Sequence, residues 1–288
     1  MSVIRKPSQL LQEPWWIRWP LIVLATTLFF GILVAPLLSI FIEAFGRGWD
    51  LYLAAVIEAD ARSAILLTLI TALIAVPLNT VFGLFAAWAI TKFDFRGKDL
   101  LLTLIDLPFS VSPVVAGLMF VLLFGAQGWF GSWLQANDVQ IIFALPGIVL
   151  ATVFITLPYV VRELVPLMQA QGRDEEEAAM TLGASGWQLF RKVTLPNIKW
   201  ALISGIILCN ARAMGEFGAV SVVSGHIRGE TNTLPLHVEI LHNEYQFAAS
   251  FACASLLTVL ALLTLFITTL VEQRRQQTEP REPSPDLN

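Results

Sequence analysis

Six stretches of the chain are apolar enough and long enough to form membrane-spanning helices. A helix that crosses a bilayer needs about 20 mainly apolar residues, and each stretch reaches that length. The first stretch is too long for a cleaved signal peptide and no small-residue cleavage site follows it, so we expect a retained anchor. The pattern therefore predicts an all-α membrane protein with six transmembrane helices. The predicted spans are Trp19–Ile42, Ala64–Ile90, Leu100–Phe124, Ile141–Val161, Trp200–Ser224 and Ala248–Val271.

Composition supports this fold class. Of the 288 residues, 56% are hydrophobic and only 14% are charged, whereas a soluble domain carries about 25% charged residues. Both cysteines, Cys209 and Cys253, lie inside apolar stretches and show neither a disulfide nor a metal-binding spacing. We expect them to pack as small apolar side chains.

The distribution of basic residues predicts the orientation. Of 18 lysines and arginines, fourteen fall in one set of connecting segments, three in the opposite set and Arg212 inside a span. Because cytoplasmic loops are rich in Lys and Arg, we expect residues 1–18 to be cytoplasmic, 19–271 to form the six-span domain and 272–288 to be a disordered cytoplasmic tail. The fourteen are Arg5, Lys6, Arg18, Lys92, Arg96, Lys98, Arg162, Arg173, Arg191, Lys192, Lys199, Arg274, Arg275 and Arg281; the three are Arg47, Arg62 and Arg228.

Two charges interrupt the fifth predicted span. Arg212 and Glu216 lie near its middle and four residues apart, which places them on one face of a helix. A mid-bilayer arginine costs about 2.5–3.5 kcal/mol on insertion scales, so such residues face a protein interior or a wet cavity. Two interpretations stay open: the pair locks or gates the span against a neighbour, or Arg212 contacts a passing oxyanion while Glu216 holds it.

The third predicted span contains a second irregularity. Pro108 and Pro113 remove two backbone donors around Ser110 and Ser112. One interpretation is a pair of kinks whose free carbonyls are satisfied by these serines. The other is a broken helix that lines a water-filled path, where Ser110 and Ser112 offer hydroxyls to an oxyanion.

The loop at about 170–199 is the longest on the basic side. Asp174 followed by Glu177 predicts a helix N-cap, and Gly183 predicts the end of that helix. A second short helix, Trp187–Lys192, is expected to end before Leu195-Pro196, because a residue before proline avoids the helical region. The small face of Ala178, Ala179 and Leu182 suits a groove on another protein; the alternative is an amphipathic hairpin on the lipid headgroups.

The order of residues in this loop resembles the EAA signature of ABC-importer permeases, EAA-x3-G-x9-I-x-LP, with valine in place of isoleucine. The loop also precedes the second-last span, as it does in that family. The resemblance implies the type I ABC importer permease fold, in which cytoplasmic coupling helices dock on an ATPase subunit. It places the ATPase-coupling residues at Glu177, Ala178, Ala179, Gly183, Val193, Leu195 and Pro196.

Further stretches, among them LLTLIDLPFSVSPVVAGL and NARAMGEFGAVSVVSG, resemble the CysW-type permeases of sulfate and thiosulfate importers. This resemblance implies a bacterial inner-membrane complex with a CysT-type second permease, two ATPases and a periplasmic sulfate-binding protein. Arg228, in an outer loop, is either a contact of that protein or a solvated residue. The alternatives are a molybdate or tungstate permease, an ion-coupled transporter or channel that works without ATP, and a membrane scaffold.

The chain lacks a recognisable nucleotide site. Its only Gly-Lys pair, Gly97-Lys98, lacks the upstream glycine spacing of a Walker A loop and is followed by aspartate. We therefore expect a transport subunit that is not itself an enzyme and binds no cofactor, with ATP and Mg held by separate ATPase subunits. His226, His237 and His242 have no convincing metal-site spacing, so no metal site is predicted.

Overall fold

The structure is a computed structural model that describes residues 15–278. Most of the predicted 1–18 segment and most of the predicted 272–288 tail lie outside these residues. The described part is helical: α1 (Trp15–Phe29), the π-helical η2 (Phe30–Val34), α2 (Ala35–Phe45), α3 (Trp49–Ile57), α4 (Ala59–Lys92), α5 (Lys98–Ser110), α6 (Pro113–Phe124), α7 (Gly131–Ala136), α8 (Leu145–Gln171), α9 (Asp174–Thr181), α10 (Gly186–Leu189), the π-helical η3 (Phe190–Thr194), α11 (Leu195–Met214), α12 (Gly218–Ser224), α13 (Leu234–Asn243) and α14 (Phe247–Thr278).

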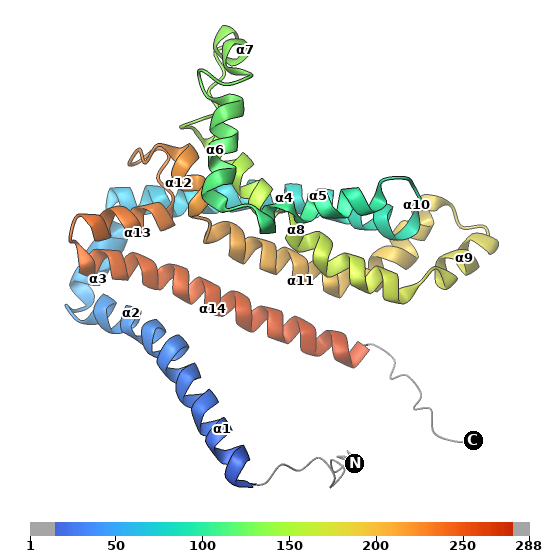
Figure 1. The fold of residues 1–288 in the computed structure, drawn as a ribbon, viewed down its shortest axis with the longest axis horizontal. Coiled ribbons are helices and arrows are strands. Elements are labelled where there is room, and N and C mark those ends of the chain that lie inside the picture. The colour runs from blue at the N-terminus through green and yellow to red at the C-terminus, as the bar shows by residue number, and fades with distance from the viewer. Residues whose placement is uncertain (1–14, 279–288) are drawn as a thin grey trace.

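Four long helices, α4, α8, α11 and α14, run lengthwise through the molecule (Figure 1). The short helices α9 and α10 lie together at one end, and α3, α12 and α13 lie at the other. We call the first the basic end, because Lys92 ends α4 there and Arg173 precedes α9. We call the other the opposite end.

Helices α4 and α11 both approach Val160 of α8 closely. A Cβ added to Gly83 of α4 would lie 2.7 Å from the Val160 Cβ, and one added to Gly205 of α11 would lie 3.1 Å from the Val160 Cα. Val160 itself is fully buried. Small residues are favoured at such contacts because apolar burial offers little drive between helices in lipid, and close backbone packing replaces it.

A buried polar contact joins the same three helices. The Asn79 amide nitrogen of α4 donates to the Thr156 hydroxyl of α8 at 2.7 Å and to the Val153 carbonyl at 3.1 Å. The Cys209 thiol of α11 lies 3.7 Å from the Thr156 carbonyl. Cys209 and Cys253 are fully buried and unpaired, as expected from the apolar runs around them.

The membrane-spanning class predicted from the sequence is confirmed. Among residues 15–278, five helical stretches are long and apolar enough to cross a membrane, and the bent pair of α5 and α6 would make a sixth span. The five are Trp15–Phe45, Ala59–Lys92, Leu145–Gln171, Gly186–Met214 and Phe247–Val271.

The third predicted span, Leu100–Phe124, is a broken helix, which is one of the two interpretations of its prolines. Helices α5 and α6 meet at an angle of 109°, and α6 stands out from the long helices (Figure 1). The break lies at Val111 and Ser112, whose ψ angles of 133° and 134° are extended. Pro113 favours this geometry, because its ring disfavours the helical conformation for the preceding residue. Pro108, by contrast, lies buried inside α5.

The fourth and fifth predicted spans have wrong boundaries. Helix α8 begins at Leu145 and continues to Gln171, ten residues beyond the predicted end at Val161, with Pro158 and Pro166 inside it. Arg162 therefore lies inside a helix and not in a connecting loop. The predicted span Trp200–Ser224 is broken after Met214, where α11 ends and α12 starts four residues later at Gly218.

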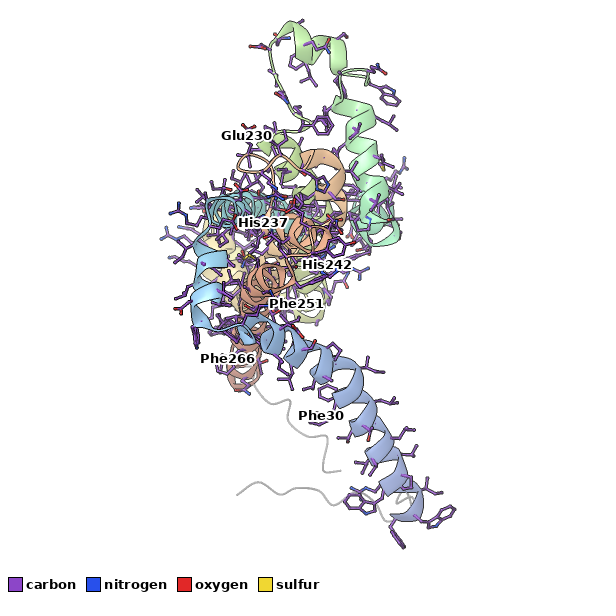
Figure 2. All side chains as sticks on the ribbon, turned by 90° about the vertical axis from the view of Figure 1, so that its left-hand side faces the viewer. Phe30, Glu230, His237, His242, Phe251 and Phe266 are labelled. Atoms are coloured by element: carbon purple, nitrogen blue, oxygen red, sulfur yellow. The ribbon has the colours of Figure 1, made fainter. Side chains whose placement is uncertain are left out.

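The first helix stands apart from the others. No residue of α1 is buried, and Figure 2 shows the helix that bears Phe30 extending away from the rest of the molecule. Only its continuation α2 packs against α14. An apolar helix without protein neighbours along most of its length requires lipid or another chain around it.

We predict that Gly83→Ala destabilises the helix bundle by about 1–3 kcal/mol, the usual cost of an added methyl group in a packed interior. The new Cβ would lie 2.7 Å from both Cβ and Cγ1 of Val160. Thermal unfolding in detergent measures the loss, and Gly83→Ala/Val160→Ala should recover part of it. Gly31→Ala is the control, since no atom lies within 4 Å of its added Cβ. Equal melting temperatures of Gly83→Ala and Gly31→Ala would contradict the close contact at Val160.

Candidate functional site: the surface loop and the charged pairs

Helix α9 ends where the sequence predicts. Gly183 has a φ of +86°, a conformation that favours glycine. Its N–H donates to the Met180 carbonyl at 2.9 Å, and the next N–H, of Ala184, donates to the Ala179 carbonyl at 3.0 Å. These bonds satisfy carbonyls that the last helical turn leaves free, so the predicted helix stop at Gly183 is confirmed.

The predicted N-cap at Asp174 is wrong. Asp174 is already helical and Arg173 occupies the cap position without a side-chain cap. The four acids of the first turn instead act through the helix dipole. The capping box lies at the start of the next helix, α10. There the Gln188 N–H donates to the Ser185 hydroxyl oxygen at 3.4 Å, and the Ser185 N–H donates to the Gln188 side-chain oxygen at 3.0 Å. The Ser-x-x-Gln spacing was a readable signal for it.

The second short helix does not end before Leu195-Pro196. Helices α10, η3 and α11 form one continuous helical stretch from Gly186 to Met214. Leu195 keeps helical angles of −63° and −42°, and Pro196 occupies the first turn of α11. The π-helical turn of η3 shifts the backbone hydrogen bonds just before the proline, so its missing N–H interrupts no regular α-helical bond.

A buried ion pair fixes α9 to the long helices. The Lys92 ammonium lies 3.0 Å from a Glu176 carboxylate oxygen, and these side chains are only 10% and 11% exposed. The other Glu176 oxygen accepts from the Thr194 hydroxyl at 2.8 Å, and Lys92 also donates to the Gly172 carbonyl at 2.7 Å. We call this set, Lys92, Glu176, Thr194 and the Gly172 carbonyl, the clamp. It joins α4, α9, η3 and the end of α8.

The EAA residues divide between an outward and an inward face. Glu177 and Ala178 are exposed, Ala179 is half-buried, and Leu182 is 89% exposed. Val193 and Leu195 are half-buried on the continuous helix, and Pro196 is exposed. The inward-facing acid is Glu176 and not Glu177, so the clamp leaves the outward face available to another protein.

Arg212 and Glu216 meet at the break between α11 and α12. Arg212 lies in the last turn of α11, and its Nη2 is 2.8 Å from Glu216 Oε2 in an ion pair. The other Glu216 oxygen accepts from the Ala219 N–H at 3.0 Å, in the first turn of α12. The Glu216 side chain is 0% exposed and that of Arg212 is 32% exposed. Glu216 thus holds the two helices together, and Arg212 is the accessible partner.

A second ion pair lies between α5 and α8, although Arg162 was expected in a connecting loop. Arg162 of α8 donates from Nε to Asp106 Oδ1 of α5 at 2.9 Å. Ser110 and Ser112 lie exposed at the adjoining break between α5 and α6. The available signal was the group of apolar residues Leu164, Val165 and Leu167, which follows Arg162 and Glu163.

The comparisons with known proteins agree with this geometry. The family model of the binding-protein-dependent transport system inner membrane component matches residues 79–277. This chain belongs to that family. The sulfate transport system permease protein CysW of Escherichia coli (strain K12) is 53% identical over 266 residues, which cover 92% of this chain and 91% of that protein. The predicted resemblance to CysW-type permeases is therefore confirmed.

Two further similarities extend the comparison. The sulfate transport system permease protein CysT of Escherichia coli (strain K12) is 37% identical over 253 residues, covering 87% of this chain and 91% of that protein. The fold is similar to a chain of a bacterial alginate ABC transporter in complex with a periplasmic protein carrying an alginate pentasaccharide. That match has a TM-score of 0.75 at 15% identity and covers 92% of this chain and 96% of the other. The predicted importer-permease fold is confirmed.

At the opposite end of this permease, Arg228 is tied to two acids. It donates from Nη2 to Glu244 and its Nη1 lies 3.7 Å from Asp60 Oδ2. The hydrogen bond to Glu244 raises the pKa of the Arg228 guanidinium. Nearby His237 is buried, and burial lowers the pKa of its imidazole. No group of three or more metal-ligating side chains occurs among residues 15–278 of the permease.

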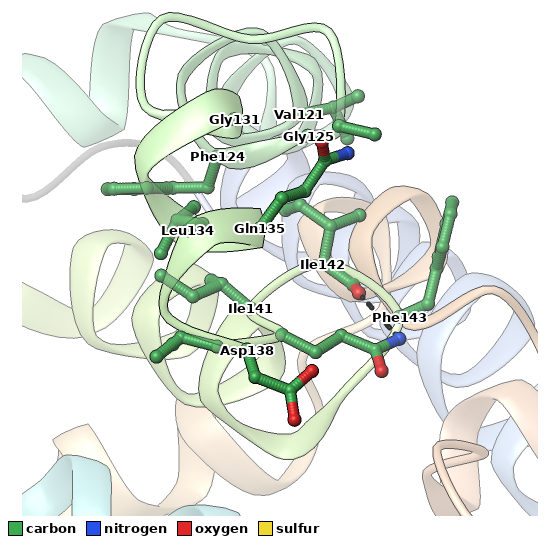
Figure 3. Close-up of a pocket in the computed structure, with 13 residues that line it drawn as sticks. Val121, Phe124, Gly125, Gly131, Leu134, Gln135, Asp138, Ile141, Ile142 and Phe143 are labelled. Atoms are coloured by element: carbon green, nitrogen blue, oxygen red, sulfur yellow. Dashed lines mark hydrogen bonds between the residues drawn. The ribbon is translucent and has the colours of Figure 1, made fainter.

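A cavity of about 640 Å³ lies between the end of α6, α7 and residues 138–143 (Figure 3). Its lining is mostly apolar, with Phe124, Leu134 and Ile142 among the side chains, and its one charged residue is Asp138. A carboxylate would repel an oxyanion, so this cavity is not suited to bind sulfate.

We predict that Lys92→Ala destabilises the permease by up to about 3 kcal/mol. This is the low end of the cost of breaking a buried ion pair, because about a tenth of each side chain still reaches solvent. Thermal unfolding in detergent and limited proteolysis of residues 172–185 measure the effect. Lys98→Ala is the matched control, since Lys98 lies 3.9 Å from the exposed Asp94 and such pairs contribute about 0–1 kcal/mol. Equal effects in both variants would refute the clamp.

We also predict that Arg212→Ala is more destabilising than Arg212→Ala/Glu216→Gln. The single variant leaves a carboxylate with 0% exposure unpaired, at a cost of about 3–5 kcal/mol. In the double variant the glutamine oxygen can still accept from the Ala219 N–H. Melting temperatures of the wild type, the two single variants Arg212→Ala and Glu216→Gln, and the double variant form a double-mutant cycle. A double variant no more stable than Arg212→Ala would show that the cost is not that of a stranded charge.

Proposed function

We propose that this chain is a membrane-spanning permease subunit of an ATP-driven importer of sulfate and thiosulfate. The observation that carries the substrate class is the 53% identity to the sulfate permease CysW along 92% of the chain. Family membership over residues 79–277 and the fold of an importer permease support the transport role.

The proposed orientation places the basic end in the cytoplasm. With Arg162 moved into α8, thirteen of the 18 lysines and arginines still belong to the set of segments that includes this end. Basic residues concentrate on the cytoplasmic side of multi-pass proteins. In this orientation both termini are cytoplasmic, and α9 and α10 face the cytoplasm of a bacterial cell.

The energy source in this proposal is a pair of separate ATPase subunits, which bind ATP and Mg. The chain has no phosphate-binding loop, since Gly97-Lys98 lacks the required spacing. The ATPase contacts the outward face of α9, where Glu177, Ala178 and Leu182 are exposed. The clamp passes movement of α9 to α4 and η3, because it joins all three.

The remaining parts of the complex follow from the same proposal. A CysT-type second permease completes the path, and a periplasmic sulfate-binding protein delivers the anion to the opposite end, near Arg228. Alternating access then exposes the anion to one side at a time. The residues proposed for the path or its gate are Arg212, Glu216, Ser110 and Ser112.

The test is reconstitution of the purified complex in vesicles with its binding protein. We expect radiolabelled sulfate to accumulate only when ATP is supplied on the ATPase side, and unlabelled thiosulfate to compete. Accumulation without ATP would instead indicate an ion-coupled transporter. Stronger competition by molybdate or tungstate than by thiosulfate would indicate a different oxyanion permease.

We predict that Leu182→Ser lowers the affinity of the permease for its ATPase by roughly tenfold or more. Burial of a leucine contributes about 1.5–3 kcal/mol, and about 1.4 kcal/mol corresponds to tenfold. Because Leu182 is 89% exposed, folding should be unaffected. Titration of the ATPase in detergent measures the affinity. Leu270→Ser, at an exposed leucine of α14, is the control; equal binding by both variants would exclude Leu182 from the docking face.

A further inference from the structure

Arg162 and Asp106 form an ion pair between α8 and α5, within two of the spans. Arg162 lies nine residues before the end of α8 at Gln171, and Asp106 lies eight residues after the start of α5 at Lys98. At 1.5 Å per residue these positions are about 12–14 Å from the basic end of each helix. Because α8 has 27 residues and is about 40 Å long, and the hydrocarbon core is about 30 Å thick, the pair lies inside the core on its basic side.

This pair is much more accessible than Arg212 and Glu216. The side chains of Arg162 and Asp106 are 56% and 41% exposed, against 32% and 0% for the other pair. Charged groups at this depth face a bundle interior or a water-filled cavity, because lipid contact is too costly. The face of α5 and α8 that carries the pair must therefore face water or another protein chain in the assembled transporter.

The geometry leaves the arginine fork free. Its Nε is bonded to Asp106 at 2.9 Å, and the Phe109 ring lies 4.3 Å from the guanidinium carbon. Neither Nη nitrogen of Arg162 has a hydrogen bond to the residues that the structure describes. Asp106 holds the Nε edge of the guanidinium and Phe109 packs against its face. Both Nη groups can therefore donate to two oxygens of a tetrahedral anion.

Ser110 adds a second kind of donor to the same face. It lies one helical turn after Asp106, so the two residues share a face of α5. Ser110 is exposed, and its hydroxyl makes no hydrogen bond within the described part of the chain. Asp106 supplies a negative charge beside the guanidinium, which weakens anion binding and so favours release.

We propose that Arg162, positioned by Asp106 and Phe109, is a transient binding site for a tetrahedral divalent oxyanion on the translocation path, with Ser110 as a second donor. This inference rests on the proposed function. It assigns the contact with the anion to α5 and α8, and it leaves Arg212 and Glu216 the task of joining α11 to α12.

Thiol labelling of the whole transporter tests the site. The native cysteines, Cys209 and Cys253, are fully buried, so a cysteine introduced at Ser110 gives the signal. We expect Ser110→Cys to react with a charged, water-soluble thiol reagent. Sulfate at ten times its dissociation constant should slow this reaction roughly tenfold, because the free fraction falls by one plus that ratio. Leu104→Cys is the control, at an exposed position on another face of α5.

Arg162 variants complete the test. Arg162→Gln in the Ser110→Cys background should abolish protection by sulfate while labelling persists. In uptake by the otherwise native complex, Arg162→Gln should raise the KM for sulfate roughly tenfold or more, as expected for loss of a charge-assisted hydrogen bond. Arg162→Lys keeps the charge without the planar fork and should give an intermediate KM. Asp106→Asn should lower both KM and kcat, because the anion binds more tightly and leaves more slowly.

The outcomes separate the two proposals. If the wild-type complex accumulates sulfate but Ser110→Cys reacts no faster than Leu104→Cys, another chain or lipid covers the face and the inference is wrong. Labelling that sulfate does not slow, or an Arg162→Gln complex with unchanged KM, would overturn it equally. A wild-type complex that fails to accumulate sulfate would count against the proposed function itself.

Discussion

The close approach of α4 and α11 to the two sides of Val160 is the constraint on which the rest of this structure depends. Gly83 and Gly205 allow it because neither carries a Cβ; an added Cβ would lie only 2.7 and 3.1 Å from Val160 atoms. In lipid, helices gain little from burying apolar surface against each other, so backbone proximity and buried polar bonds set their arrangement. The Asn79–Thr156 hydrogen bond joins α4 to α8 in the same region.

Both functional regions are extensions of these three helices. Lys92, the last residue of α4, holds α9 through Glu176, and Thr194 of η3 holds the same carboxylate. Arg212, in the last turn of α11, and Arg162, on α8, carry the intramembrane charges. The surface loop and the charged pairs are therefore connected by packed helices.

Hydropathy predicted the fold class and most spans, because span length and apolar composition are local properties. The breaks were harder to locate. The chain turns through 109° between α5 and α6, just before Pro113. A hydropathy window measures apolar composition and not chain direction, so it predicted α5 and α6 as one span. The fifth span failed for a similar reason: Gly215 and Phe217 are compatible with a helix, and the break becomes evident only once Glu216 caps α12.

The site was predicted in part. The helix stop at Gly183 and the exposed face with Leu182 follow from local sequence, since a positive φ favours glycine and the EAA spacing marks the loop. Which of four successive acids faces inward depends on Lys92, 84 residues before Glu176 and in contact with it only in the folded chain. Arg162 was misassigned because its partner Asp106 lies on another helix, and only the tertiary structure brings them together.

The π-helical turn Phe190–Thr194 has a mechanical consequence. It lets the chain pass Pro196 without interruption, so Gly186–Met214 is a single rod of 29 residues, about 43 Å long at 1.5 Å per residue. One end of the rod lies beside α9, and the other ends at Gly215. No break in the helix separates α10 from Arg212. The first break after α10 is Gly215–Phe217, between α11 and α12. A movement of α10 along this helix would therefore change the angle between α11 and α12 at these three residues.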